Sequence, residues 1–388
     1  MKSVMLVGAV VAPLVLAGGP AHAFLGISKE FNISTFCEVS APRQTIVYVD
    51  DSILIEGQHQ WAERLYAKLV ANLMPSEPVA VVRLSPGTGR AEEVWKACYP
   101  DYTDEQKAGM KGFFTNFFDK PPLKVLESQQ GVFRQQLGVA LGKVLSEASR
   151  PPAKVQIDPD RPPRKQLIRA IVADEARFDR TRGDIRVIIY SDMIENSDLG
   201  VAWRSSDQDA HNAASRLGLN LQNAVIYAYG VGASLSQRDS GIDNAKMFWD
   251  SFFRSAGAHL AGFGSDLVVT TGAPVAKADY EIEVATPGEP RIGRIHLFVD
   301  HEGRLQDSYI LLGTRGRSLL TEGTFLCKGG STCRLDAKAP SPVLTVEGNE
   351  EIKLSGPRDA LKGTIGVAGG KLPDGTAAVF PIVARLAP

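Results

Sequence analysis

The chain has 388 residues and 44% hydrophobic content, so it exceeds the length of one ordinary domain and has enough apolar side chains for packed cores. Its 43 basic and 44 acidic residues give a formal net charge of −1, which excludes a global field that would recruit nucleic acid or an anionic membrane surface. We therefore expect two domains and a partner that is a protein or another macromolecule, not nucleic acid.

The first 23 residues have the pattern of a secretory signal peptide. Lys2 precedes an uncharged run at 4–16, and Ala-His-Ala at 21–23 has the small residues of a cleavage site. The apolar run is shorter than the roughly 20 residues that span a bilayer, and no later run reaches that length. A buried amino-terminal helix is the alternative, but it leaves the A-x-A ending unexplained. We predict cleavage near Ala23 and a periplasmic or secreted mature chain without a transmembrane segment.

Residues 24–271 alternate between strand and helix patterns. Residues 44–50 (QTIVYVD) predict a strand, 58–73 a helix and 79–84 a second strand, which together form a βαβ unit. The stretch near 85–125 is rich in Pro, Gly and charged residues and predicts an insertion. Helical spacing returns at 132–145, stops at a proline-rich loop at 151–163, and resumes at 165–178.

Two buried strands, 186–190 (RVIIY) and 224–229 (AVIYAY), and a helix at 244–260 complete this region. The aromatic stripe of that helix, Phe248, Trp249, Phe252 and Phe253, is interpreted as core. His259, near the end of the same helix, is interpreted as a core or helix-end residue. The alternation of strands and helices predicts a doubly wound, mostly parallel α/β sheet.

After a linker at 272–277 the sequence changes to short alternating runs separated by turns. Residues 292–299 and 308–312 predict a β-hairpin, and 319–326, 343–346, 351–354 and 378–386 predict further strands. Residues 278–388 therefore predict a small all-β domain, a β-sandwich or barrel, which we expect to be an accessory module.

The four cysteines are even in number in a chain predicted to reach an oxidising compartment. Cys327 and Cys333 enclose a flexible loop that lets two strand ends meet, so they are expected to pair, which leaves Cys37 for Cys98. A zinc site is the alternative, but neither pair has the two-residue spacing of zinc knuckles and no histidine lies near them.

Acidic residues follow two of the predicted buried strands. Asp50-Asp51-Ser52 ends the first strand, and Ser191-Asp192 ends the strand at 186–190. Ligands collect at the carboxyl ends of strands in open parallel sheets, so these residues are expected to share one rim of the sheet.

At these residues the chain resembles the von Willebrand factor A family, whose metal-ion-dependent adhesion site reads D-x-S-x-S after the first strand. In VYVDDSILIEG, Asp50 and Ser52 match the first two ligand positions, and Leu54 replaces the second serine. YSDMIENS resembles a later element that brings an aspartate, here Asp192, and MFWDSFFRSAGAHL resembles a late helix of bacterial members.

The resemblance implies a von Willebrand factor A-like fold over 24–271 and a degenerate metal site formed by Asp50, Ser52 and Asp192. The family's threonine ligand comes from a loop before a helix such as that at 165–178, and no threonine lies between Thr115 and Thr181. The site would then hold either no metal or a weakly bound Mg²⁺ or other divalent cation, with Asp51 and Glu195 as substitute ligands.

Two other interpretations of the acids stay open. Asp50 and Asp192 could cap loops or helix starts, or could act as a paired acid and base, which needs a nucleophile and a cleft. The sequence contains no G-x-S-x-G, H-E-x-x-H or phosphate-loop motif, so no catalytic residue is assigned.

The sequence thus predicts an exported, non-enzymatic binding or assembly protein. It would engage its partner through the strand-end rim, with Asp51 and Glu195 as partner-binding residues. The alternatives are a metal-dependent envelope hydrolase and a structural, self-associating envelope component.

Overall fold

The computed structural model describes residues 33–39, 41–52, 58–112, 122–148, 165–179, 181, 183–202, 204–231, 239–265, 274–313, 318–328, 332–339 and 349–387. The predicted signal peptide, Leu54, the proline-rich loop and the predicted strand at 343–346 lie outside these residues.

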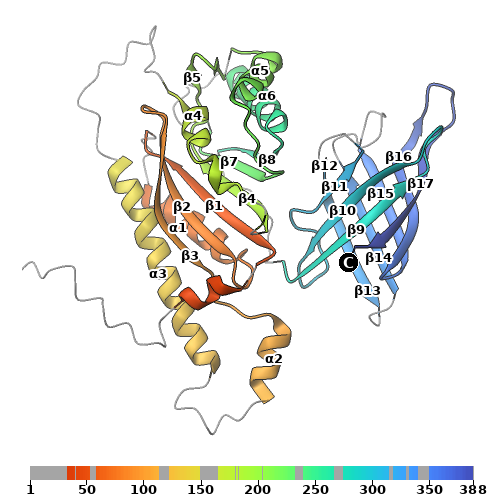
Figure 1. Ribbon diagram of the computed structural model, residues 1–388, viewed down its shortest axis with the longest axis horizontal. Coiled ribbons are helices and arrows are strands. Elements are labelled where there is room, and N and C mark those ends of the chain that lie inside the picture. Colours follow the sequence, from red (N-terminus) through yellow and green to blue (C-terminus); the bar gives the residue numbers. More distant parts are fainter. Residues whose placement is uncertain are drawn as a thin grey trace, which may run out of the picture.

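The first part of the chain forms a six-stranded sheet in the order β3-β2-β1-β4-β7-β8 (Figure 1). All neighbouring strands are parallel except β2 and β3. The strands are β1 Arg43–Asp50, β2 Pro78–Ser85, β3 Arg90–Cys98, β4 Asp184–Tyr190, β7 Val225–Tyr229 and β8 His259–Gly264, and a separate short hairpin pairs β5 Asn196–Ser197 with β6 Gly200–Val201. This arrangement confirms an α/β sheet that is mostly parallel.

Helices cover both faces of the sheet, so the central strands are buried on both sides. On one face, Ile46 and Tyr48 of β1 pack with the helices α4 to α6; on the other, Val47 and Val49 pack with α1 and α3. The helices are α1 Gln58–Val70, α2 Asp104–Gly112, α3 Pro122–Ala148, α4 Leu167–Val172, α5 Asp207–Leu217 and α6 Asp239–Ser255, with short 3-10 turns at η2 Ser34–Glu38 and η3 Glu175–Arg177. The aromatic stripe of α6 is fully buried, as predicted.

Three elements differ from the sequence-based expectation. Much of the predicted insertion is β3, an edge strand whose charged side chains face solvent, followed by α2. The helix expected at 165–178 is only α4 followed by a 3-10 turn. His259 lies in β8, not in a helix, because α6 ends at Ser255 and Gly257 turns the chain with a positive φ of 71°.

The second part of the chain is one nine-stranded antiparallel sheet in the order β12-β11-β10-β9-β17-β16-β15-β14-β13. The strands are β9 Ala276–Val284, β10 Arg291–Val299, β11 Tyr309–Leu312, β12 Ser318–Leu319, β13 Thr321–Lys328, β14 Thr332–Ala339, β15 Glu350–Pro357, β16 Ala360–Lys371 and β17 Ala377–Leu386. The predicted hairpin is present as β10 and β11.

This sheet curls around its own apolar core. Arg304 in the β10–β11 connection bridges to Thr324 of β13, and the amide of Leu305 donates to the carbonyl of Gly323 at 2.9 Å. The last strand of the sheet therefore meets the connection that follows β10. Side chains from β9 to β17 fill the interior, including Tyr280, Ile295 and Phe380.

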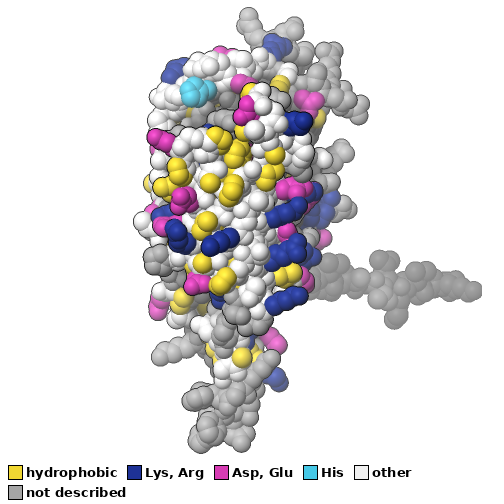
Figure 2. Space-filling view, turned by 90° about the vertical axis from the view of Figure 1, so that its right-hand side faces the viewer, with side chains coloured by type: hydrophobic (Ala, Val, Ile, Leu, Met, Phe, Trp, Pro, Cys, Tyr) yellow, Lys and Arg dark blue, Asp and Glu magenta, His cyan; other side chains and the backbone are white. Residues whose placement is uncertain are grey.

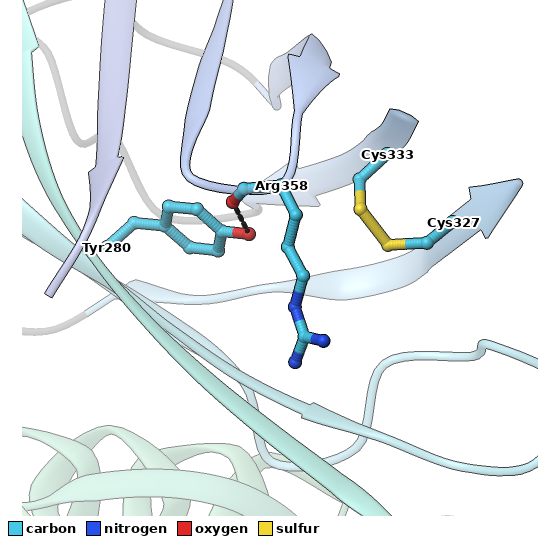
Figure 3. Close-up of a disulfide and its surroundings, with 4 residues drawn as sticks. All are labelled: Tyr280, Cys327, Cys333 and Arg358. Carbon is cyan, nitrogen blue, oxygen red and sulfur yellow. Dashed lines mark hydrogen bonds between the residues drawn. A yellow bond between two sulfur atoms is a disulfide. The ribbon is translucent and has the colours of Figure 1, made fainter. Parts of the chain in front are cut away.

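Both predicted disulfides are present. Cys37 joins Cys98, which ties η2 to the end of β3, and Cys327 joins Cys333 directly across the β13–β14 pair. Figure 3 draws the second disulfide together with Tyr280, whose hydroxyl donates to the carbonyl of Arg358 at 2.9 Å. That hydrogen bond connects β9 to the β15–β16 turn, so both features hold turns of the curled sheet in place.

The second sheet completes the core of the first. Tyr309 of β11 and Leu319 of β12 are buried in the same apolar cluster as Val225 and Tyr227 of β7. This cluster lies on the face of the first sheet that α1 and α3 also cover. The carboxyl-terminal domain thus contributes side chains to the core of the α/β sheet.

A buried ionic cluster joins the two sheets at the amino-terminal ends of the parallel strands. Arg43 of β1 binds Glu77 through Nε at 3.0 Å and Nη2 at 2.9 Å, and its Nη1 donates to Asp307 Oδ2 at 3.0 Å. Arg186 of β4 lies 3.3 Å from Glu77, and the hydroxyl of Tyr227 donates to Asp307. All of these side chains are buried, and the two arginines balance the two carboxylates.

A histidine makes a second charged contact between the sheets. His296 Nε2 of β10 lies 2.8 Å from Asp184 Oδ2 of β4, and its Nδ1 contacts Asp279 of β9. Burial lowers the pKa of His296, but the two carboxylates outweigh burial and raise it overall. The second sheet is thus fixed to the amino-terminal edge of the first by charges as well as by apolar packing.

The outer surface of the molecule beside the second sheet carries mixed charge. Figure 2 shows lysine and arginine side chains next to acidic ones, and exposed pairs such as Lys338–Glu322 and Lys353–Glu351 have this composition. Among the helices that the structure describes, none is both long enough and apolar enough to cross a membrane.

Candidate functional site

The candidate site lies at the carboxyl ends of β1 and β4. These strands are parallel neighbours in the sheet. The chain continues from β1 to β2 on one side of this pair and from β4 to β7 on the other side. Such a reversal of strand order opens a crevice at the carboxyl rim of a doubly wound sheet. Asp50 is the last residue of β1, and Ser191 and Asp192 directly follow β4, so the structure brings these three residues together.

Asp50 is buried and accepts hydrogen bonds on both carboxylate oxygens. Its Oδ1 accepts from the backbone amide of Ser52 at 2.9 Å and from the Ser52 hydroxyl at 2.6 Å. Its Oδ2 accepts from the Ser191 hydroxyl at 2.7 Å. Asp50 and Ser52, expected from the resemblance to be two metal ligands, are thus in direct contact, as when an aspartate caps its own loop.

Lys165, which the sequence-based assignment missed, lies between the two aspartates. Its Nζ is 2.8 Å from Asp50 Oδ2 and 2.5 Å from Asp192 Oδ1, and its side chain is 11% exposed. Burial lowers the pKa of Lys165, but the attraction of the two carboxylates outweighs burial and raises it overall. The site therefore contains a permanent internal cation.

The loop after β4 is anchored by α6, which covers the same face of the sheet as α4. The indole Nε1 of Trp249 on α6 donates to the carbonyl of Met193 at 2.7 Å, and Met193 has a positive φ of 57°. The amide of Ile194 donates to Asp192 Oδ1 at 3.0 Å. These contacts hold the Asp192 carboxylate toward Lys165.

Asp51 points away from this pair. Its side chain is partly exposed and accepts a hydrogen bond from the Ser85 hydroxyl at the end of β2. Burial, together with the nearby Asp50 charge, raises the pKa of Asp51. Asp51 thus stays at the rim, beside the exposed Ser52.

Glu195 is not a rim residue. Its side chain is fully buried, and it accepts from the amide of Ile168 at 2.8 Å at the start of α4 and from the Ser197 hydroxyl. The structure therefore gives Glu195 the role of a helix cap, not that of a partner-binding or metal-binding side chain.

Glu195 makes the stability of this region depend on pH. Burial raises its pKa from 4.5 to about 7, so the folded chain holds a proton that the unfolded chain releases between these values. We expect the free energy of unfolding to fall by roughly 3 kcal/mol from this group as the pH rises from 4.5 to 7, and to stay level above 7.

Urea unfolding of the wild type and of Glu195→Gln at pH 5 and pH 8 measures this contribution. The Gln variant is expected to lose this component of the pH dependence, and Glu127→Gln on the exposed surface of α3 serves as the control. An unchanged difference between the two pH values in Glu195→Gln would show that Glu195 does not titrate in this range.

The residues at the site do not fit a bound divalent cation. Mg²⁺ needs about six oxygen ligands at roughly 2.0–2.1 Å, whereas the space between Asp50 and Asp192 holds the Lys165 ammonium at hydrogen-bonding distances. Within the described ranges, no group of three or more His, Cys, Asp or Glu side chains could hold a metal ion. The degenerate metal site that the sequence suggested is thus an ion-pair network.

The fold and this network define a protein that joins a mostly parallel α/β sheet to a curled antiparallel sheet. No family model matches the sequence, and no curated protein matches it. Among solved structures, the human COPII-coat protein Sec24c is similar with 10% sequence identity and a TM-score of 0.35, over 92% of this chain and 45% of that one. The chain thus spans less than half of that protein, and a likeness at this level carries no argument about function.

Proposed function

We propose that this is an exported, non-enzymatic binding or assembly protein that engages a macromolecular partner through the strand-end rim of a von Willebrand factor A-like domain. The observation that carries the proposal is the position of Asp50, Lys165 and Asp192 at the reversal of strand order, where doubly wound sheets bind ligands.

The placement of the second sheet supports this choice of surface. Asp307 and His296 attach that sheet to the amino-terminal ends of β1, β4 and β7. The carboxyl ends lie at the opposite edge, where Ser52 and Thr88 are exposed. A partner can therefore reach the rim without displacing the second sheet.

The two disulfides support export, because such bonds persist in oxidising compartments. The hydrolase alternative needs a cation held by Asp50, Asp51 and Asp192. The Lys165 ammonium already occupies the space between Asp50 and Asp192, and Asp51 is directed to Ser85. The binding function is therefore the one that this arrangement favours.

Site-specific photo-crosslinking tests the proposed surface. A photoreactive amino acid at Thr88, in the turn after β2, is expected to give an adduct of defined mass with a partner from the envelope of the producing cells, and excess unlabelled protein should suppress it. The same group at Thr376, in the exposed β16–β17 turn, is the control and should give none.

Each other outcome counts against the proposal. Adducts of equal yield from Thr88 and Thr376 would mean that the rim has no special role. An adduct of the chain with itself alone would favour the self-associating envelope component, and no adduct at Thr88 would remove the rim as the binding surface.

A further inference from the structure

We propose that His296 is a pH-sensitive latch between the two sheets: its imidazolium holds the curled sheet against the α/β sheet, and loss of one proton loosens the junction and widens a cavity at the seam. The inference concerns the attachment of the second sheet, at the edge opposite the proposed binding rim. It does not depend on which partner, if any, that rim engages.

Both ring nitrogens of His296 face a carboxylate. Nε2 lies 2.8 Å from Asp184 Oδ2 in the first sheet, and Nδ1 contacts Asp279 Oδ1 in the second. A neutral imidazole has a hydrogen on one nitrogen only, so in that form a lone pair would face one of the two carboxylates. The arrangement therefore requires the imidazolium, which has a hydrogen on both nitrogens.

The packing around the ring couples it to the core of the first sheet. His296 is 3% exposed, so water and salt screen its contacts little. Its ring stacks on that of Tyr309, with centroids 4.8 Å apart and planes inclined by 19°, and the Phe298 ring meets it edge-on. Because Tyr309 is buried in the apolar core of the first sheet, a change at the imidazole is transmitted to the junction.

The other charges near the ring do not cancel the two carboxylates. Lys277 of β9, whose Nζ lies 3.3 Å from Asp279 Oδ2, opposes the imidazolium but is partly exposed. Arg43 of β1 packs over the Phe298 ring at 5.9 Å, and two buried carboxylates balance its charge. Burial lowers the pKa of His296, but its two carboxylate partners outweigh burial and raise it above the ordinary value of 6.5.

A cavity of about 590 Å³ lies at the seam, and both parts of the chain contribute to its walls. Pro42 of the first part and Lys277 of the second are among its lining residues. The amide of Asp184 donates to the Pro42 carbonyl at 2.9 Å, and Asp279 lies 3.3 Å from Lys277. The bridge from Asp184 through His296 to Asp279 therefore joins the two walls, and breaking it allows them to separate.

The rest of the junction limits this movement. Arg43 binds Glu77 and Asp307 without any contribution from His296, and Tyr309 and Leu319 stay in the core of the first sheet. We therefore expect the seam to widen locally while the two sheets remain attached.

The direction of the pKa shift fixes the pH range. The pKa of His296 in the folded chain lies above the value of 6.5 in the unfolded chain, so the latch is complete below pH 6.5 and is lost as the pH rises through the folded value. The contribution of Glu195 falls between pH 4.5 and about 7 and belongs to the opposite edge of the sheet. A variant at His296 separates the two effects.

A distance measurement across the seam tests the latch. Spin labels on Ala108→Cys of α2 and Glu302→Cys of the β10–β11 turn lie at exposed positions on the two sides, where Asp104 and His301 approach to 3.6 Å. The four native cysteines are paired, so the labels attach to the introduced thiols. In double electron–electron resonance, the distance distribution is expected to shift to longer values between pH 6 and pH 9, with a midpoint above pH 6.5.

Two variants of the labelled protein decide the cause of the shift. His296→Gln cannot carry the charge and should give the longer distribution at both pH values. His301→Gln removes an exposed histidine of the same seam and should keep the shift. A wild-type distribution that does not change between pH 6 and pH 9, or a shift that persists in His296→Gln, would overturn the proposal.

Nuclear magnetic resonance of the wild type labelled with ¹⁵N-histidine covers the case in which His296→Gln does not fold. The ring of His296, assigned through its contact with Tyr309, is expected to carry a proton on both nitrogens at pH 6 and on one nitrogen at pH 9. A neutral ring at pH 6 would equally overturn the proposal.

Discussion

Replacing Asp307 with alanine is expected to lower the free energy of unfolding by about 3–5 kcal/mol, because it removes one partner of a buried ionic cluster. The carboxylate accepts from Arg43 at 3.0 Å and from the Tyr227 hydroxyl. Without it, Arg43 and Arg186 share the single charge of Glu77 in a region closed to water. A loss of this size is a large fraction of the roughly 5–15 kcal/mol that stabilises an ordinary domain.

The expected loss also reaches beyond the second sheet. Asp307, in the connection between β10 and β11, binds both β1 and β7, so its removal weakens the junction through which Tyr309 and Leu319 enter the core of the first sheet. Urea unfolding followed by circular dichroism measures the effect, with Glu289→Ala on the exposed β9–β10 turn as the control. A loss below about 1 kcal/mol would show that the cluster does not hold the sheets together.

Replacing Asp50 with alanine is expected to cost about 3–5 kcal/mol as well. The change leaves Lys165 with only one carboxylate partner. It also removes the acceptor of three hydrogen bonds, which the Ser52 amide, the Ser52 hydroxyl and the Ser191 hydroxyl donate. If Asp50 served only the proposed binding rim, this change would abolish partner capture without unfolding the protein. The structure indicates that it affects folding first, so loss of capture by this variant would not identify a binding residue.

A double-mutant cycle separates the ion pair from the rest of the effect. In Asp50→Ala/Lys165→Met the buried charge is removed together with its partner, so this variant should be more stable than the sum of the two single losses predicts. Unfolding of the four proteins in urea at pH 7 gives the coupling free energy. Additive losses would mean that Lys165 and Asp50 do not interact in solution.

The central strands could be predicted from the sequence because they are buried on both faces. Parallel strands in this position are continuous runs of β-branched and aromatic residues, as in RVIIY of β4, and neither packing nor register is needed to recognise them. Edge strands give a weaker signal. In β3 the run Arg90-Ala-Glu-Glu is typical of a loop, and only pairing with β2 makes it a strand. The short β8, HLAGFG, contains two glycines and is only partly buried.

The acids of the site could be predicted, and their cation could not. Asp50 and Asp192 end runs that are recognisable strands, so their position on one rim follows from the general topology of parallel sheets. Lys165 belongs to no strand or long helix, and the contact with Asn196 that positions it depends on the tertiary fold. One signal was available: this lysine lies just before a helix, where the family resemblance would place a threonine ligand.

The junction between the sheets was also beyond prediction from the sequence. Arg43 and Glu77 stand at strand starts, where charged residues are ordinarily solvated, and Asp307 lies 264 residues away from Arg43. Nothing in their local patterns indicates burial. The burial follows only from the docking of β11 and β12 against β7 and β8.

A crystal structure of the wild-type protein grown in Mn²⁺, with anomalous diffraction data, is the most direct test of the claim that the strand-end site is complete without metal. We expect the Lys165 ammonium within about 3 Å of both Asp50 and Asp192, and no anomalous peak between them. A manganese peak bound by the two carboxylates, with the lysine side chain displaced, would contradict the account.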